Sequence, residues 1–122
     1  MDRFHREMVK GENAAVNHDW DLALQIFGSV KQEGQWLLVD PKTKCSVLAM
    51  EATAATASGA LRRALKCYEG YLQLALEMGD VQAQLLAHGA LASCVEALGE
   101  SSRSQSSYEA YLRCAEELQA PV

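Results

Sequence analysis

Apolar residues recur along the chain with the three- and four-residue spacing of amphipathic helices and not with the alternation of strands. One stripe lies in the first quarter and consists of Leu22, Ala23, Ile26, Phe27 and Val30. A broader stripe of the same spacing consists of Leu61, Ala64, Leu65, Tyr68, Tyr71, Leu72 and Ala75. Ala, Leu, Glu, Gln, Lys and Met dominate these stretches, and β-branched runs are few. We therefore predict an all-α protein.

Turn signals divide the pattern into six helices. The predicted helices cover approximately residues 3–16, 20–33, 41–58, 60–78, 81–98 and 101–119. Asp19, Asp40 and Asp80 stand where N-caps are expected, and Pro41 follows one of them at the first helical position. Residues 35–40, QWLLVD, fit either an extra helical turn or an extended linker. Because the other connections are very short, neighbouring helices are expected to pack antiparallel.

The sequence repeats itself at a spacing of 40 residues. YEGYL at residues 68–72 returns as YEAYL at residues 108–112, and the same register aligns Gly59 with Gly99 and Arg63 with Arg103. A shift of 41 places an earlier copy, Gly11, Trp20, Ala23 and Phe27, opposite Ala52, Leu61, Ala64 and Tyr68. Helix pairs used three times in one register indicate a helical repeat protein. We predict one domain over residues 1–122 with units at approximately 3–34, 41–79 and 80–119.

The pattern Gly11–Trp20–Ala23–Phe27 resembles the tetratricopeptide repeat, and residues 52–68 and 92–108 carry degenerate versions of it. The period resembles the longer, roughly 40-residue variant of scaffold and adaptor proteins. This resemblance covers about residues 4–118 and implies an α-solenoid of three antiparallel helix pairs in a right-handed superhelix. Small residues would let two paired helices approach, and the aromatic would fill the space toward the next pair. Tyr68 and Tyr108 are therefore interpreted as equivalent packing residues.

Length, charge and hydropathy narrow the class of protein. A chain of 122 residues fits one domain, and its formal charge of −5 disfavours binding to nucleic acid. No window approaches 18 uninterrupted apolar residues, so we expect no membrane insertion. The first residues, MDRFHREMVKGEN, are charged and unlike a secretory leader. These features favour a cytoplasmic protein.

Residues that carry chemistry are scattered. The cysteines, Cys45, Cys67, Cys94 and Cys114, match no compact zinc spacing and fall on apolar stripes, which indicates buried reduced thiols. The histidines, His5, His18 and His88, lie in separate units, and no catalytic or phosphate-binding motif occurs. We expect no enzyme activity, no metal and no cofactor. The serine-rich residues 101–107 fit either a frayed helix start or a regulatory phosphorylation site.

The resemblance implies a concave groove lined by the first helix of each pair, where a helical or extended segment of a partner protein would bind. Transferred by register, the groove residues are His5, Met8, Val9, Glu12, Val16, Ala49, Met50, Thr53, Thr56, Leu86, Gly89, Ala90, Ser93 and Glu96. Family members that grip a C-terminal carboxylate use Lys, Asn and Arg here. This chain instead has Met8, Glu12, Met50, Leu86 and Ala90, so such a clamp is not expected. The residues suit an apolar trough, although close packing between helices would use the same small side chains.

The last predicted helix is a candidate for self-association. Helical repeats usually end in a polar capping helix, whereas the last predicted helix carries Tyr111, Leu112 and Leu118. If these side chains are exposed, either the chain is a fragment of a longer array or another chain covers this end. A twofold homodimer through the last unit is one solution.

Overall fold

A computed structural model describes the backbone of residues 3–119 and, apart from residues 101–104 and 119, their side chains. Within this part the chain forms helices and no strand, which confirms the all-α prediction. The helices are α1 (Arg3–Val16), α2 (Trp20–Gln32), α3 (Pro41–Ala57), α4 (Leu61–Met78), α5 (Val81–Ala97) and α6 (Ser101–Gln119). A short 3-10 helix, η1 (Gly34–Leu38), joins α2 to α3, so the ambiguous segment is mainly an extra helical turn.

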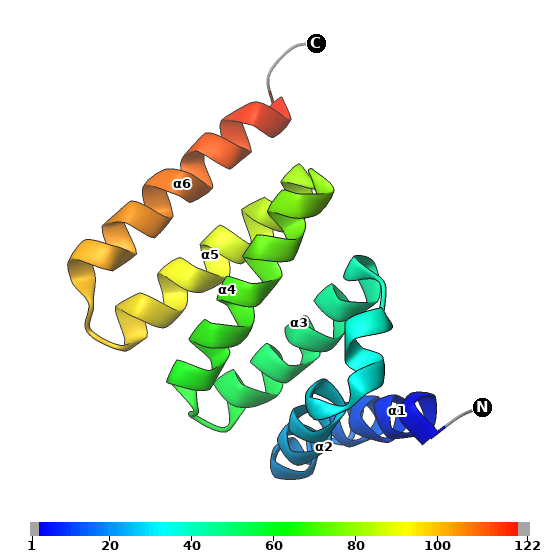
Figure 1. Cartoon of the computed structure of the whole chain (residues 1–122). Helices are drawn as coiled ribbons and strands as arrows, with labels where there is room; N and C mark the ends of the chain where they lie inside the picture. Colours follow the sequence, from blue (N-terminus) through cyan, green and yellow to red (C-terminus); the bar gives the residue numbers. More distant parts are fainter. Residues whose placement is uncertain (1–2, 120–122) are drawn as a thin grey trace.

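Each helix packs against the next one in the sequence, and α1 also contacts α3. Figure 1 shows the resulting order, with α1 and α2 at one end of the molecule and α6 at the other. The turn between the two helices of each pair places side chains from both helices on one face of the molecule. Positions that lie far apart in the sequence, in α1 and α3 or in α2 and α4, are thereby brought to common surfaces.

The turns α1–α2, α3–α4 and α5–α6 share one backbone geometry. Each contains a residue of positive φ: His18 at 61°, Gly59 at 84° and Gly99 at 80°. The next N–H then bonds a carbonyl at the helix end: Asp19 to Ala14 at 2.8 Å, Ala60 to Ala55 at 2.8 Å and Glu100 to Val95 at 2.9 Å. These equivalent positions differ by 41 and 40 residues, which is the register found in the sequence. His18 therefore occupies a position that the later turns give to glycine.

The three predicted aspartate caps are present. Asp19 accepts a hydrogen bond from the backbone N–H of Leu22 at 3.4 Å, and Asp40 accepts one from Thr43 at 3.1 Å. Asp80 accepts one from Ala83 at 3.1 Å. Each bond satisfies an amide that the first helical turn leaves without a partner.

The core is continuous through the first two helix pairs and reaches α5. Phe27, Ala23 and Ala64 are completely buried in it, whereas several large apolar side chains, among them Leu38, Leu86 and Leu112, remain exposed. The two repeat tyrosines are not packed alike, although the sequence suggested that they are equivalent. Tyr68 is half-buried against the core, but Tyr108 is 41% exposed, and its hydroxyl donates a 2.7 Å hydrogen bond to Glu96 Oε2. The packing role is thus stronger for Tyr68, because α5 follows α4 and adds neighbours to it.

All four cysteines are buried and none is in a disulfide, as their apolar surroundings indicated. Burial raises the pKa of the Cys67 thiol to about 12, with the carboxylate of Glu51 as the next cause. This thiol is therefore protonated at neutral pH and a poor nucleophile. Within residues 3–119, no helix has the length and hydropathy needed to cross a membrane.

Candidate functional site

The structure brings five of the predicted groove residues together on one cavity between α1 and α3. This α1–α3 cavity has a volume of about 430 Å³. Its lining is Glu12, Ala15, Val16, Trp20, Ala49, Met50 and Thr53. Most of that surface is apolar, and Glu12 is the ionisable member of this lining. Helical spacing explains the convergence, since residues three and four apart on α1 and on α3 face the same side.

The local structure of the lining residues determines the polarity of this cavity. Val16 ends α1 and is 78% exposed, so its side chain is open to a partner. Trp20 begins α2, and the ring of His18 stacks on it with centroids 5.1 Å apart. The Thr53 hydroxyl donates to the Ala49 carbonyl at 2.9 Å, which satisfies its hydrogen bond within the helix. The cavity therefore presents mainly apolar surface and few polar groups that could hydrogen-bond to a ligand.

Two other predicted groove residues of α1 line a separate cavity. His5 and Met8 contribute to a space of about 330 Å³ that Leu38 and Val39 also line. Met8 is only 9% exposed and packs with Phe4 in the core, so its main contacts are internal. Val9 is 40% exposed but lines neither cavity.

The predicted groove residues near the end of α3 and on α5 stay apart from the α1–α3 cavity. Leu86 is 66% exposed, and Thr56, Ser93 and Glu96 are also on the surface. Gly89 and Ala90 are half-buried. A Cβ atom built on Gly89 would lie 3.2 Å from the Tyr111 ring, so Gly89 serves the contact between α5 and α6. The sequence left both a groove position and helix packing open for this glycine, and its closeness to Tyr111 is a packing contact.

The proposed self-association residues are on the surface of α6. Leu112 is 59% exposed, Leu118 is 42% exposed and Tyr111 is 37% exposed. The Tyr111 ring nevertheless contacts Gly89, so part of it already packs within the chain. Leu112 and Leu118 are the more available apolar groups.

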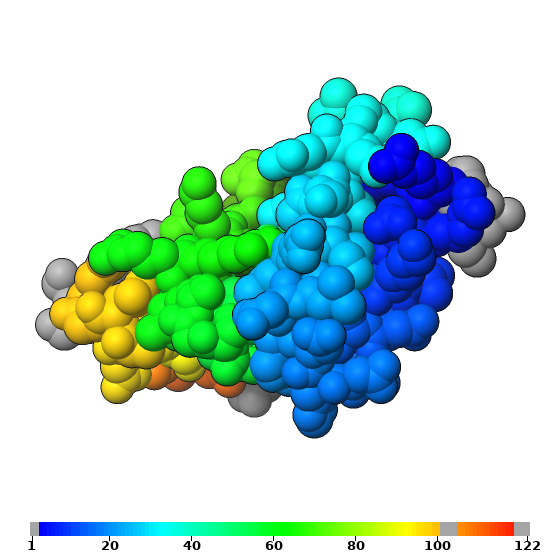
Figure 2. Space-filling model, turned by 90° about the horizontal axis from the view of Figure 1, so that it is seen from below, coloured from blue at the N-terminus to red at the C-terminus, as the bar shows by residue number. Residues whose placement is uncertain are grey.

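A third cavity, which the sequence did not reveal, lies between α2, α3 and α4. This α2–α4 cavity has a volume of about 490 Å³. Its lining is Gly28, Lys31, Gln32, Leu48, Glu51, Arg63, Lys66 and Cys67. In Figure 2, α4 (green) adjoins α2 (blue) on the face seen from below. The cavity is rich in charge, in contrast to the α1–α3 cavity.

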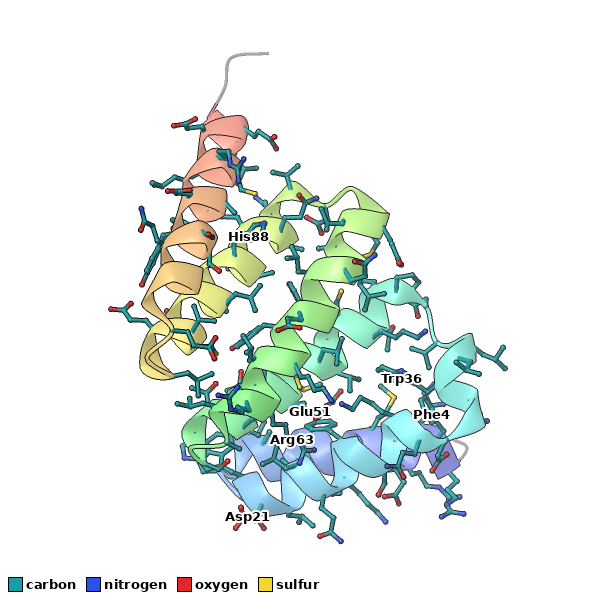
Figure 3. All side chains as sticks on the ribbon, turned by 60° about the vertical axis from the view of Figure 1, so that its left-hand side comes forward. Phe4, Asp21, Trp36, Glu51, Arg63 and His88 are labelled. Carbon is teal, nitrogen blue, oxygen red and sulfur yellow. The ribbon has the colours of Figure 1, made fainter. Side chains whose placement is uncertain are left out.

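Glu51 lies in the wall of this α2–α4 cavity and is only 1% exposed. Arg63 Nε donates to its Oε2 at 2.9 Å, and Arg63 Nη2 donates to the Leu24 carbonyl at 2.6 Å. Lys31 Nζ lies 2.6 Å from Oε1 as an ion pair, although the geometry of this contact is not that of a hydrogen bond. Figure 3 shows Glu51 and Arg63 where α4 passes α2. The three side chains thus join α2, α3 and α4 through one buried carboxylate.

Among the side chains that the structure describes, no group of three or more His, Cys, Asp or Glu residues is arranged to hold a metal ion. His88 lies on α5, and burial together with the nearby charge of Arg113 holds its pKa below the usual value (Figure 3). Its imidazole is half-buried.

Comparison with models of known protein families gives no match to this chain, and comparisons with curated proteins and with solved structures also give none.

Proposed function

We propose that this chain is a tetratricopeptide-like α-solenoid domain that acts as a protein-interaction module of the cytoplasm. The observation that carries the proposal is the α1–α3 cavity, whose lining is apolar and open at the surface. The 40-residue register of caps and turns supports a repeat architecture, because α3–α4 and α5–α6 use equivalent residues at equivalent places. In such an architecture the first helices of successive pairs face one groove.

The chemistry of the cavity suits a helical or extended segment with apolar side chains. Val16 and Thr53 are exposed at its edge, and Met50 is half-buried in its floor. An amphipathic helix buries one apolar stripe in a groove of this kind, and Met adapts its shape to different partners. Glu12 would pair with a basic residue at the margin of that stripe. No covalent chemistry is involved in this function.

A display library of amphipathic helical peptides tests the proposal. Binders selected on the wild-type domain should lose affinity for Met50→Arg and for Thr53→Arg, because each change puts a charge into the apolar cavity. Thr53 is exposed, so its variant should fold normally even if Met50→Arg is less stable. Leu76→Arg is the control, since Leu76 is 51% exposed on α4 and does not line the α1–α3 cavity.

Binding is measured by fluorescence anisotropy, and folding by circular dichroism. Peptides that bind wild type and Leu76→Arg but not Thr53→Arg support the groove. Peptides that bind all variants equally, or no selected peptide at all, would contradict the assignment of this cavity as the partner site.

Self-association through α6 is a second candidate function, which the exposure of Leu112 and Leu118 favours. Light scattering after size exclusion should show a dimer at tens of micromolar, a concentration range typical of weak contacts. Leu112→Glu should return the chain to a monomer. Leu38→Glu, at an 86% exposed leucine of η1, should not change the dimer. A monomeric wild-type chain would argue against this candidate.

A further inference from the structure

We propose that the α2–α4 cavity is an anion site that takes a phosphate dianion. Its lining gathers the cationic side chains of Lys31, Arg63 and Lys66 around the single carboxylate of Glu51. The local excess is therefore two positive charges, in a chain whose formal charge is −5. Three of the 11 Lys and Arg residues line this one cavity, so its charge is positive whereas the net charge of the chain is negative.

Two of the three cations are held in position before any ligand arrives. Arg63 is fixed at two points, by Glu51 Oε2 and by the Leu24 carbonyl. Lys31 is drawn to Oε1 of the same buried carboxylate. All of these groups stand on helices, and fixed donors bind an anion with less loss of side-chain entropy than mobile ones.

Donors remain free to reach an anion. Arg63 uses Nε and Nη2 in the contacts above, which leaves Nη1 for a ligand. Lys66 is exposed and has no ion pair among the described side chains. Gln32 adds an amide on the same lining. Arginine and lysine presented together in this manner are the groups that bind phosphate in proteins.

The charge balance favours phosphate over a carboxylate. A phosphate monoester carries about −1.5 to −2 at neutral pH, which matches an excess of two positive charges. A carboxylate, with a single negative charge, would neutralise only half of that excess. The site is also independent of the α1–α3 cavity: Leu48 and Glu51 project from one side of α3, and Met50 and Thr53 project from the other.

Titration with inorganic phosphate, followed by ¹⁵N–¹H chemical shifts at constant ionic strength, tests the proposal. We expect saturable shifts around Gln32, Glu51 and Lys66 with a dissociation constant on the order of a millimolar. Acetate at the same ionic strength should give much weaker shifts. O-phosphoserine and glycerol phosphate distinguish the sources, since tighter binding of one shows whether a phosphorylated side chain or a small phosphate ester fits better.

Lys66→Gln should weaken phosphate binding about tenfold, because it removes one charged donor. Lys66 lies outside the Glu51 ion pairs, so the variant should keep the wild-type melting temperature. Lys10→Gln is the control at another exposed lysine, on α1. Phosphate shifts that are absent, unsaturable, or unchanged in Lys66→Gln would overturn the proposal, whatever the outcome for the α1–α3 cavity.

Discussion

Gly11 on α1 and Phe27 on α2 lie so close together that no side chain fits between them. A Cβ atom built on Gly11 would stand 2.7 Å from Cε1 of Phe27, and Phe27 is completely buried. The ring cannot move away without disturbing the core around it. The contact therefore sets the distance between the first two helices.

Gly11→Ala should lower the free energy of unfolding by about 1–2 kcal/mol. Alanine favours the helix by about 1 kcal/mol over glycine, but overpacking a core costs roughly 1–3 kcal/mol, and here the clash is with a fixed ring. Gly70→Ala is the matched control in α4, because its Cβ would meet Leu48 Cδ1 at an ordinary 3.4 Å. Urea unfolding should show the two substitutions with opposite signs. An equal gain in both would contradict the tight contact.

Much of the helical framework could be predicted because it depends on nearby residues. Each aspartate cap and each turn glycine acts within one helical turn, so the roles of Asp40 and Gly59 can be predicted from the neighbouring residues alone. The residues of the α1–α3 cavity could also be predicted from the sequence, because the repeat register placed Val16 and Met50 on the same side of the molecule.

The α2–α4 cavity could not be predicted in the same way. Glu51 stands in an Ala- and Thr-rich helix and reads as one more solvated acid, yet it is 1% exposed. Its burial depends on Lys31 and Arg63, which approach from two other helices. The available signal was weak: Glu51 falls on the same stripe as Leu48 and Ala55, where a polar residue is out of place.

Glu51→Gln should destabilise the fold by about 2–4 kcal/mol, because removing one partner leaves charges that are costly to bury. Lys31 and Arg63 keep part of their solvent exposure, so we expect the lower end of that range. A double-mutant cycle with Arg63→Met should give a coupling energy above about 1 kcal/mol.

The exposed pair of Arg62 and Glu100 provides the comparison. Its closest atoms are 3.6 Å apart, and Arg62 is 75% exposed. Arg62→Gln should change stability by less than about 0.5 kcal/mol. Thermal unfolding of the same variants measures both effects, and a loss for Glu51→Gln as small as for Arg62→Gln would show that the buried carboxylate adds little.

Gly59→Ala should cost about 1–2 kcal/mol through backbone strain alone. Its φ of 84° is unfavourable for a residue with a Cβ, although that atom would meet nothing within 4 Å. Gly34→Ala is the control, because its surroundings are equally open and its φ is ordinary. We expect Gly34→Ala to be neutral or slightly stabilising in urea unfolding. Similar losses in both would rule out φ as the cause.

The raised pKa of Cys67 predicts a loss of stability in alkali. The folded-state value is about 12, against an ordinary value of 9.0, because burial disfavours the thiolate. Between these values the unfolded chain releases a proton that the folded chain keeps. The contribution of Cys67 is therefore complete below pH 9 and declines as pH rises toward 12, by up to about 1.4 kcal/mol per pH unit.

Urea unfolding of wild type and Cys67→Ala across pH 8 to 11 measures this contribution. Cys67→Ala should be less stable at pH 8, because it leaves a small cavity, and its stability should fall less steeply above pH 9. Native-state alkylation provides a second measurement, in which iodoacetamide should label Cys67 far more slowly than it labels the unfolded chain. Parallel pH profiles for the two proteins, together with rapid labelling of Cys67, would show that this thiol is accessible and titrates normally.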